Sequence, residues 1–360
     1  MRLRYDRHPG TTEELWLVGV GSFGYRLPVG IRKYIYDTRS IMTYQILQGD
    51  CLETLKTLPE CSVQTCVTSP PYYGLRDYGN DAQIGLEQSP EEYIAKLVEV
   101  FREVRRVLKD DGTLWLNLGD SYNSGSGGYD DKYEGGFVGR EDIKDKVMKR
   151  KGRADNSLAP KQLMMIPARV ALALQADGWW LRSEIVWHKP NPMPESVTDR
   201  PTKSHEMIYL LAKSARYFYD AEAIKEPNAN PDRTNYTPGK RAYAEGNTEQ
   251  CNDDRTRRND GFEAYANGKQ CNGRNKRDVW TVTTKPYKEA HFATFPPDLI
   301  EPCILAGSKI GDTVLDPFAG SGTTLAVSIK HGRNGIGCEL NPEYITLIEK
   351  RLSEVQPLML

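Results

Sequence analysis

A glycine-rich segment near the C-terminus constrains the fold more than any other part of the chain. Residues 316–324 read DPFAGSGTT; they follow the strand-like residues 313–315 and lead into a helix-like stretch at residues 325–330. Small residues in such a turn let a ligand approach backbone N–H groups at the start of a helix. No lysine follows the glycines, so the segment is not a phosphate-binding P-loop. The pattern predicts a nucleotide-type binding site at one edge of an α/β sheet.

An acidic residue supports this prediction. A second short strand, residues 335–338, ends at Glu339, roughly 20 residues after the glycines. An acid in this position of a nucleotide-binding sheet normally accepts hydrogen bonds from ribose hydroxyls. The ligand of the glycine-rich segment is therefore expected to carry a ribose.

A proline turn near the other end of the chain is the second informative motif. Residues 68–74 read TSPPYYG and follow a strand-like apolar segment at residues 62–67. Two prolines fix the backbone and donate no hydrogen bond, so they belong where a strand ends. The Ser69 hydroxyl, the proline carbonyls and the Tyr72 ring then form a rigid group of acceptors beside an aromatic face. Such a group suits a planar base with an exocyclic amine, pulled out of a duplex. A Ser-Pro-Pro-Tyr run alone is more often a plain turn. The presence of the glycine-rich segment in the same chain favours the base-binding interpretation.

Together, the proline turn, the glycine-rich segment and Glu339 resemble the amino-methylating DNA methyltransferases, which use S-adenosylmethionine. The catalytic motif precedes the cofactor motif, which is the permuted order of the beta class of that family. The resemblance extends from Met42 to the C-terminus and is weakest at residues 122–161 and 227–274. It implies a Rossmann-like mixed α/β sheet with helices on both faces, circularly permuted and carrying an inserted target-recognition region.

The resemblance also implies a set of site residues. The catalytic residues would be Ser69, Pro70, Pro71 and Tyr72. The cofactor would be bound by Asp50, Thr68, Phe295, Asp316, Pro317, Phe318, Gly320, Ser321, Gly322, Thr323, Glu339 and Asn341. Asp316 and Phe318 are expected to flank the cofactor, and Glu339 to contact its ribose. For Asp50 a helix N-cap is an equal alternative, and Phe295 could be plain core.

The identity of the methylated base depends on Ser69. Family members with Ser at the first motif position mostly methylate cytosine N4, and those with Asp mostly methylate adenine N6. The resemblance therefore favours cytosine N4. Adenine N6 or RNA methylation remains an alternative, as does a non-catalytic DNA-binding protein on the same fold. No Pro-Cys loop of the ring-carbon cytosine methyltransferases is present, because Pro302-Cys303 lies in a predicted helix.

Changes in composition divide the chain into four parts. Residues 1–41 are expected to be a poorly ordered extension; their GVGSFG run at 19–24 cannot easily open a helix, because Pro28 follows closely. Residues 42–226 form the catalytic half, with a mobile basic loop at 122–161. Residues 227–277 form the target-recognition insert, and residues 278–360 the cofactor half.

The DNA contacts are predicted mainly in the insert. It is rich in Asn, Arg and aromatic residues, which can read base edges and stack, although a solvated loop has a similar composition. A Trp-His-Lys-Pro run at residues 187–190 is similar to a family segment near the base pocket. The predicted DNA-contacting residues are Lys189, Arg255, Arg257, Arg258, Arg274 and Arg277.

The composition also bears on the location and the partners of the protein. The net charge is −1, so charge that binds double-stranded DNA must be local. Seven cysteines without CxxC spacing indicate a reducing cytoplasm, and no apolar run is long enough for a membrane span. Cys251 and Cys271 of the insert could be zinc ligands, but with no partner pair nearby free thiols are favoured and no metal is expected. The resemblance adds two possible partners: a cognate restriction endonuclease, and a second copy of the chain if the protein is a homodimer rather than a monomer.

Overall fold

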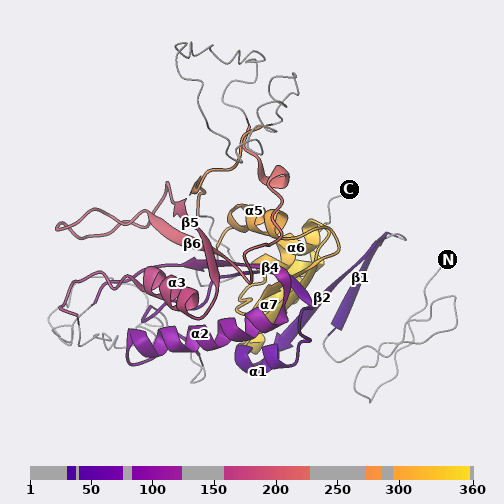
Figure 1. Cartoon of the computed structure of the whole chain (residues 1–360), viewed down its shortest axis with the longest axis horizontal. Helices are drawn as coiled ribbons and strands as arrows, with labels where there is room; N and C mark the ends of the chain where they lie inside the picture. The colour runs from indigo at the N-terminus through magenta and orange to yellow at the C-terminus, as the bar shows by residue number, and fades with distance from the viewer. Residues whose placement is uncertain are drawn as a thin grey trace, which may run out of the picture.

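A nine-stranded mixed sheet forms the centre of the part of the protein that the computed structural model describes, namely residues 31–37, 40–75, 83–123, 158–227, 273–284 and 295–356 (Figure 1). The strand order is β1-β2-β9-β8-β3-β4-β6-β5-β7. The strands are β1 (Ile31–Asp37), β2 (Ser40–Gln48), β3 (Val63–Thr68), β4 (Leu108–Leu118), β5 (Trp180–His188), β6 (His205–Ala212), β7 (Val279–Thr281), β8 (Thr313–Asp316) and β9 (Asn334–Glu339). The helices are α1 (Cys51–Lys56), α2 (Pro90–Val107), α3 (Ile166–Ala176), α5 (Pro297–Gly307), α6 (Thr323–Lys330) and α7 (Pro342–Ser353), with the 3-10 turn η2 (Glu222–Ile224).

Strand direction brings the two sequence motifs to one edge of the sheet. Strands β2, β9, β8, β3 and β4 are mutually parallel, and β6 is antiparallel to both β4 and β5. Every residue of β3 is buried, as expected for a central strand covered on both faces. Because β3 and β8 are neighbours, the proline turn after β3 and the glycine-rich segment after β8 leave the sheet side by side.

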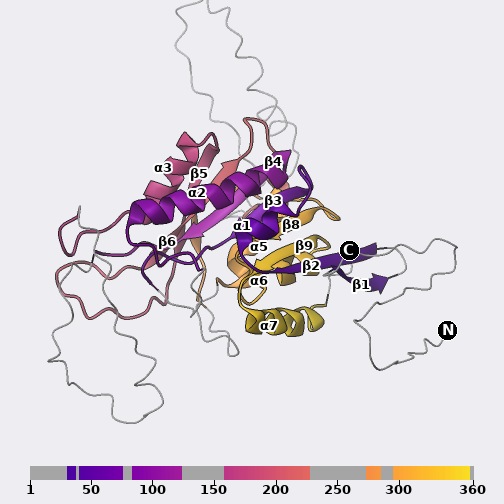
Figure 2. The same ribbon diagram turned by 90° about the horizontal axis from the view of Figure 1, so that it is seen from below.

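Helices cover both faces of the sheet. One hydrophobic core joins α1, α2 and α3 to one face, and a second joins α5 and part of α6 to the other. A third, smaller core packs α6 and α7 near β2. Figure 2 shows α1, α2 and α3 together on one side of the strands and α7 on the other. This arrangement confirms the predicted Rossmann-like fold class.

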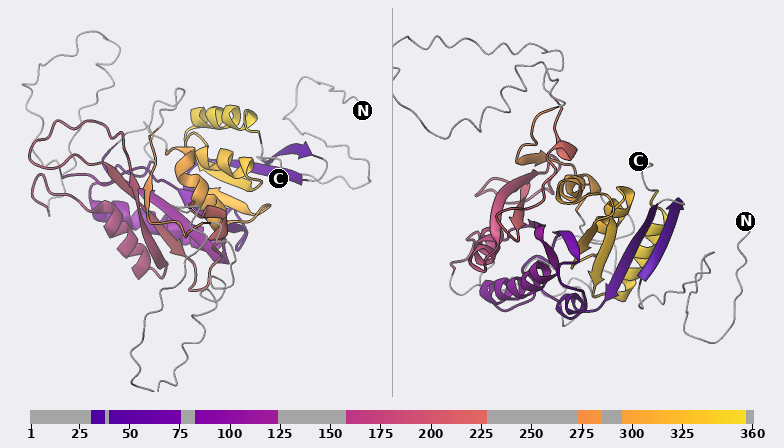
Figure 3. Two further views of the ribbon diagram at one scale, coloured as in Figure 1. Left: turned by 90° about the horizontal axis from the view of Figure 1, so that it is seen from above. Right: turned by 45° about the vertical axis from the view of Figure 1, so that its right-hand side comes forward.

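The N-terminal boundary differs from the prediction. Residues 1–41 were expected to be a poorly ordered extension, but residues 31–37 form β1, which pairs antiparallel with β2, and β2 itself begins at Ser40. Strand β2 also pairs with β9, so the start of the described chain lies beside its C-terminal half (Figure 3). A strand with one side unpaired favours the addition of another strand, and β1 fills that position. The prediction is therefore wrong for residues 31–37 and 40–41, and residues 1–30 and 38–39 lie outside the described part.

Two other predicted segments fall largely outside the described residues. The basic loop predicted at residues 122–161 is described only at 122–123 and 158–161, and the insert at 227–277 only at 227 and 273–277. No helix among the described residues is both long and apolar enough to cross a membrane.

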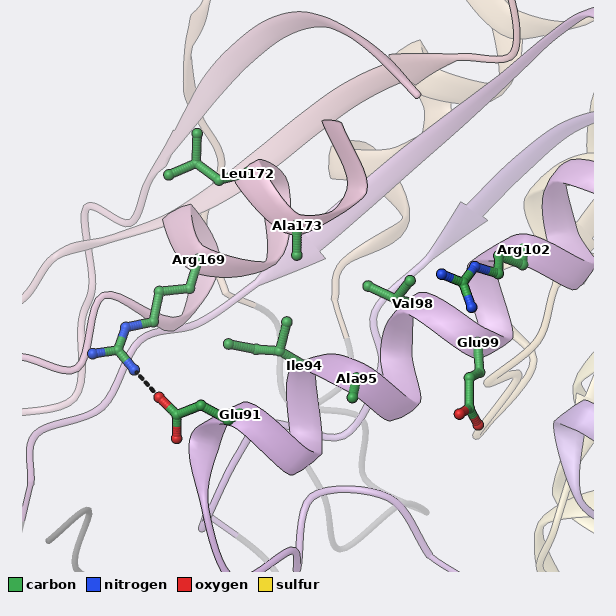
Figure 4. Close-up of a pocket in the computed structure, with 9 residues that line it drawn as sticks. All are labelled: Glu91, Ile94, Ala95, Val98, Glu99, Arg102, Arg169, Leu172 and Ala173. Atoms are coloured by element: carbon green, nitrogen blue, oxygen red, sulfur yellow. Dashed lines mark hydrogen bonds and ion pairs between the residues drawn. The ribbon is translucent and has the colours of Figure 1, made fainter. Parts of the chain in front are cut away.

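A surface groove lies between α2 and α3 (Figure 4). Apolar side chains such as Ile94, Val98 and Leu172 line it, and an ion pair of 3.1 Å between Arg169 Nη1 and Glu91 Oε1 spans its rim. None of its lining residues belongs to the catalytic or cofactor sets predicted above.

Candidate active site

The proline turn is anchored to the helix that packs beneath it. The hydroxyl of Tyr93, a fully buried residue of α2, donates a hydrogen bond of 2.8 Å to the carbonyl of Pro71. Gly74 follows with a positive φ of 64°, and its N–H donates to the carbonyl of Gly85. The turn therefore has a fixed position relative to the end of β3, as the two prolines led us to expect.

The Tyr72 hydroxyl lies at the centre of a polar network. It donates to Glu206 Oε2 at 2.7 Å and accepts from Asn117 Nδ2 at 2.8 Å. The Ser69 hydroxyl donates to it at 3.4 Å. Burial and the nearby Glu206 carboxylate raise the pKa of Tyr72 well above its usual value, so the phenol stays protonated. The network thus joins the catalytic turn to β4 and β6.

The ring of Tyr72 lies against a glycine. A Cβ atom built on Gly119, just after β4, would be 2.4 Å from Tyr72 Cε2. Any side chain at position 119 would therefore displace the ring. The missing side chain lets the ring pack on the backbone, which fixes the plane of the aromatic face.

Lys189 completes the network. Its ammonium forms an ion pair with Glu206 Oε1 and lies 4.2 Å from the centre of the Trp187 ring. The side chains of Lys189 and Glu206 are only 18% and 16% exposed. Lys189 is therefore held within the site, and its predicted contact with DNA stays a prediction.

Sequence reasoning missed Glu206 and Asn117. Glu206 lies near the start of β6, and because this strand is antiparallel its first residues reach the same edge as the ends of β3 and β4. Asn117 is a buried polar residue in the apolar strand β4. That unusual placement was the one signal in the sequence that could have singled it out.

The glycine-rich segment needs its glycines for two different reasons. Gly320 and Gly322 have positive φ angles of 51° and 75°. A Cβ on Gly322 would lie 2.8 Å from Ile348 of α7, so this glycine allows close helix packing. A Cβ on Gly320 would meet nothing closer than the Phe318 carbonyl at 3.9 Å, which leaves open space for a ligand beside it.

An arginine from α7 holds the segment in place. Arg351 Nη1 donates to Thr323 Oγ1 at 2.6 Å, and to the Oγ and carbonyl oxygen of Ser321 at 3.0 and 3.1 Å. The hydroxyls of Ser321 and Thr323, both predicted to bind the cofactor, thus serve at least to shape the loop. Arg351 was missed because no pattern in the sequence links it to the glycines.

Glu339 ends β9 beside the glycine-rich segment. Its Oε2 accepts from the N–H of Gly320 and its Oε1 from the N–H of Asn341, both at 2.8 Å. Burial raises the pKa of this carboxyl to about 7, against the opposing effect of the two backbone donors. Each oxygen retains a second lone pair, which matches the predicted acceptance of ribose hydroxyls.

Asp316 forms buried hydrogen bonds that link the proline turn to the glycine-rich segment. Its carboxylate accepts hydrogen bonds from Thr68 Oγ1 at 2.6 Å, Thr324 Oγ1 at 2.7 Å and the Phe318 N–H at 3.0 Å. Burial raises its pKa to about 6. Asp316 was expected to flank the cofactor, but the side chain is 1% exposed and all its contacts point into the protein. Asp316 and Thr68 thus form a buried link between β3 and β8, and their predicted contacts with the cofactor stay predictions.

Five further cofactor candidates have structural contacts. Asp50 caps α1, where its Oδ1 accepts from the N–H of Leu52 at 2.9 Å, and Asn341 caps α7. Pro317 is buried, and Phe318 packs against the core that contains α2. Phe295 packs against the core that contains α5. The alternatives of a helix cap for Asp50 and core packing for Phe295 are thus observed, and their cofactor contacts stay predictions.

Two of the predicted DNA-binding arginines hold the base of the insert together. Arg274 Nε and Arg277 Nε each lie 3.0 Å from Glu226 Oε2, and the backbones of Glu226 and Arg274 exchange two hydrogen bonds. The chain thus enters and leaves the insert at one clamped point, and DNA contacts by Arg274 and Arg277 stay predictions. Arg255, Arg257 and Arg258 lie outside the described residues.

No cluster of metal-binding side chains occurs within the described residues, and the two cysteines of the insert, Cys251 and Cys271, are not among them. Cys303 is buried inside helix α5, so the Pro302-Cys303 pair has no catalytic loop around it, as predicted. Within these ranges, the polar chemistry of the site comes from Ser, Tyr, Asn, Lys and carboxylate groups.

Comparisons with known proteins agree with this geometry. A family model described as DNA methylase, of the N6/N4 type, matches residues 63–350. The chain is 47% identical over 310 residues to the type II methyltransferase M.Cfr9I of Citrobacter freundii, covering 85% of this chain and 87% of the relative. It is 42% identical over 313 residues to M.SmaI of Serratia marcescens, covering 87% and 92%. A solved structure of PvuII DNA methyltransferase (cytosine-N4-specific) has a similar fold, with a TM-score of 0.55, 18% identity and 86% of each chain covered.

Proposed function

The chain belongs to the DNA methylase family of the N6/N4 type, and from that premise we propose that it methylates the exocyclic N4 amine of cytosine in double-stranded DNA. It is a DNA methyltransferase of the type II restriction-modification kind, and its cofactor is S-adenosylmethionine. The assignment of the base rests on one observation, the neutral Ser69 at the first position of the proline turn. In the family that the motif resembles, a serine there accompanies cytosine and an aspartate accompanies adenine.

The turn supplies what the amine needs to react. The lone pair of an exocyclic amine is delocalised into the ring, so the nitrogen is a poor nucleophile. Ser69 Oγ and a proline carbonyl would accept the two amine hydrogens and draw the nitrogen towards sp³ geometry. The Pro71 carbonyl already accepts from Tyr93, which favours the carbonyl of Pro70 as the second acceptor. An amine held in this way would direct its lone pair at the methyl group that the cofactor supplies, and it would release one proton to water.

The residues around the glycine-rich segment fit the adenosyl cofactor. The open space beside Gly320 admits a ligand close to the backbone, and the two oxygens of Glu339 have lone pairs for the ribose hydroxyls. When bound, the cofactor supplies an electrophilic methyl group on a sulfonium. The shared edge of β3 and β8 would place that methyl beside the proline turn.

Tyr72 is proposed to stack on the flipped base. Its ring is fixed in plane by Gly119 on one side and by its hydroxyl contacts at the tip. Stacking on an aromatic side chain contributes about 1–3 kcal/mol per base. A ring that is fixed before the base arrives loses little side-chain entropy on binding.

Binding of the DNA duplex is proposed to involve the insert, clamped at its base by Glu226, together with Arg255, Arg257 and Arg258. Lys189, within the site, and Arg274 and Arg277, at the base of the insert, would contribute positive charge. A cognate restriction endonuclease would be the functional partner. The chain would act either as a monomer or as a homodimer.

The product of the reaction tests the proposal directly. The purified protein is incubated with methyl-labelled S-adenosylmethionine and unmethylated genomic DNA, with RNA as a parallel substrate, and the modified nucleoside is identified by mass spectrometry. We expect N4-methylcytosine in DNA alone. N6-methyladenine would overturn the assignment of the base while leaving the fold and cofactor intact, and label confined to RNA would overturn the substrate.

Cofactor affinity is expected to depend on pH through Glu339. The carboxyl has a pKa of about 7 without cofactor, and only its ionised form can accept from both ribose hydroxyls. A proton must therefore leave before binding at lower pH, so affinity is fully present above the pKa and falls as pH drops through it. Between pH 8 and pH 6 the dissociation constant measured by calorimetry should rise about tenfold.

The control for this prediction is Glu339→Gln, which keeps the shape of the side chain without its titration. This variant should bind the cofactor more weakly at pH 8 and lose most of the pH dependence. Titration of the cofactor itself affects both proteins equally and cancels in the comparison. Equal pH slopes for the two proteins would contradict the role of Glu339.

A further inference from the structure

We infer that Glu206 is a positioning residue that orients the Ser69 hydroxyl for catalysis through the hydroxyl of Tyr72. The inference rests on the methyltransferase activity proposed above and adds a component to its site. Hydrogen bonds link the three groups in the order Glu206, Tyr72, Ser69, which we call the hydroxyl chain. Glu206 is nevertheless 134 residues from Tyr72 in the sequence.

The direction of the hydrogen bonds follows from the chemistry of each group. An ionised carboxylate can only accept, so Glu206 Oε2, 2.7 Å away, forces the Tyr72 proton towards itself. The oxygen of Tyr72 can then only accept, and it takes the proton of Ser69. The carboxylate thus fixes the orientation of a hydroxyl that it does not touch.

Counting lone pairs shows what this leaves at Ser69. Its oxygen has two lone pairs, and one accepts from Asn117 Nδ2 at 3.3 Å. Its single proton points to Tyr72, so the second lone pair remains for an N–H of the target amine. Glu206 also adds negative character to the chain, because a hydrogen bond to an ion is stronger than one between neutral groups. A neutral serine thereby becomes a better acceptor for the amine.

The other contacts of Glu206 hold the carboxylate in place. Lys189 binds the opposite oxygen, Oε1, while Oε2 faces Tyr72. The Glu206 side chain is 16% exposed, which keeps the surrounding dielectric low. Lys189 is itself fixed over the Trp187 ring. The ion pair therefore occupies Oε1, and Oε2 accepts from the Tyr72 hydroxyl and, at 3.2 Å, from Asn117 Nδ2.

Loss of the carboxylate would allow the hydrogen bonds of the hydroxyl chain to reverse their direction. A glutamine at position 206 can present its NH₂ group to the Tyr72 oxygen. Tyr72 would then donate to Ser69, and the Ser69 proton would point at the amine. Two hydrogen-bond donors would then face each other, and Ser69 could not accept from the amine. We expect Glu206→Gln to lower the single-turnover rate of methyl transfer by about 10- to 100-fold, which is the size of a lost hydrogen bond to a charged group.

The decisive measurement is a double-mutant cycle with Tyr72→Phe, in single-turnover conditions with saturating S-adenosylmethionine and DNA. Tyr72→Phe cuts the chain but keeps the ring on Gly119 and leaves the ion pair of Glu206 intact. If Glu206 acts through Tyr72, each single variant is slow and the double variant is no slower than the worse of the two. Losses that multiply in the double variant, or a wild-type rate for either single variant, would overturn the inference.

Comparing the rate with the dissociation constants distinguishes an orienting role of Glu206 from a purely structural one. An orienting role changes the rate of the chemical step and leaves the dissociation constants for cofactor and DNA within about twofold, because no binding contact is lost. A structural role would weaken DNA binding instead. The matched control is Glu184→Gln, which also removes a carboxylate bonded to a tyrosine hydroxyl, that of Tyr209 at 3.3 Å; this pair lies near the middle of β5 and β6. It should retain the wild-type rate.

This test can fail independently of the assignment of the base. Should the wild-type product be N6-methyladenine, the proposed function fails while the cycle still measures the hydroxyl chain. Should the product be N4-methylcytosine and the losses multiply, the proposed function stands and the role of Glu206 fails.

Discussion

Tyr72→Ala is expected to lower the rate of methyl transfer by about 10³-fold or more, with cofactor affinity unchanged. The substitution removes both the face on which the base stacks and the hydroxyl that joins Ser69 to Glu206. Stacking contributes about 1–3 kcal/mol and an orienting contact in the transition state about 2.7–4 kcal/mol, so the two losses together are on the order of 10³-fold or more. Single-turnover kinetics with labelled cofactor measure the rate, and calorimetry measures cofactor binding.

The adjacent tyrosine provides the control. Tyr73 follows Tyr72 in the same turn, but it is buried and packs its ring 5.5 Å from that of Tyr93. Tyr73→Phe keeps that packing and should retain nearly full activity. Turnover of Tyr72→Ala within tenfold of the wild type would contradict both the stacking role and the hydroxyl network.

Asp316→Ala is expected to destabilise the fold and weaken cofactor binding together. The change removes the acceptor for Thr68, Thr324 and the Phe318 N–H, all at the junction of β3 and β8. Thr324 can turn to the carbonyl of Val67 at 3.3 Å, but the other two buried donors lose their partner. The cost should be on the order of 3 kcal/mol of unfolding free energy. Chemical denaturation measures this loss, and cofactor affinity should fall at least about tenfold as the loop loosens.

Asp316→Asn is the matched variant. Its amide oxygen still accepts from Thr68 and Phe318, and Thr324 can accept from the new NH₂ group, so the loss of stability should be small. Similar losses for the Ala and Asn variants would contradict the role of Asp316 as a buried acceptor.

Asp316→Asn should also differ from the wild type in the pH dependence of its stability. The folded-state pKa of Asp316 is raised to about 6 from 3.8, so the protonated form favours the folded state. The contribution to stability is fully present below pH 3.8 and is lost as pH rises through 6. Asp316→Asn should therefore gain stability relative to the wild type between pH 5 and pH 8. A constant difference over this range would show that the carboxyl does not titrate as described.

Local patterns in the sequence determined the elements and the two motifs. The strand, glycine-rich loop and helix at residues 313–330, and the proline turn after β3, lie where residue types alone placed them. The cap of α1 by Asp50 is equally local, since its hydrogen bonds reach only two and three residues ahead. The order of the two motifs was enough to indicate the family. Such signals are readable because they depend on near neighbours in the chain.

Which side chains meet depends on how the strands and helices pack together. Thr68 and Asp316 are 248 residues apart, and their contact exists because β3 and β8 are neighbours in the sheet. Glu206 reaches Tyr72 because β6 runs antiparallel, and Arg351 reaches the glycine-rich segment because α7 packs on α6. Strand β1 exists because β2 offers it a free edge. Strand order and helix packing are set by the burial of whole faces, summed over many residues, and no short pattern in the sequence records them.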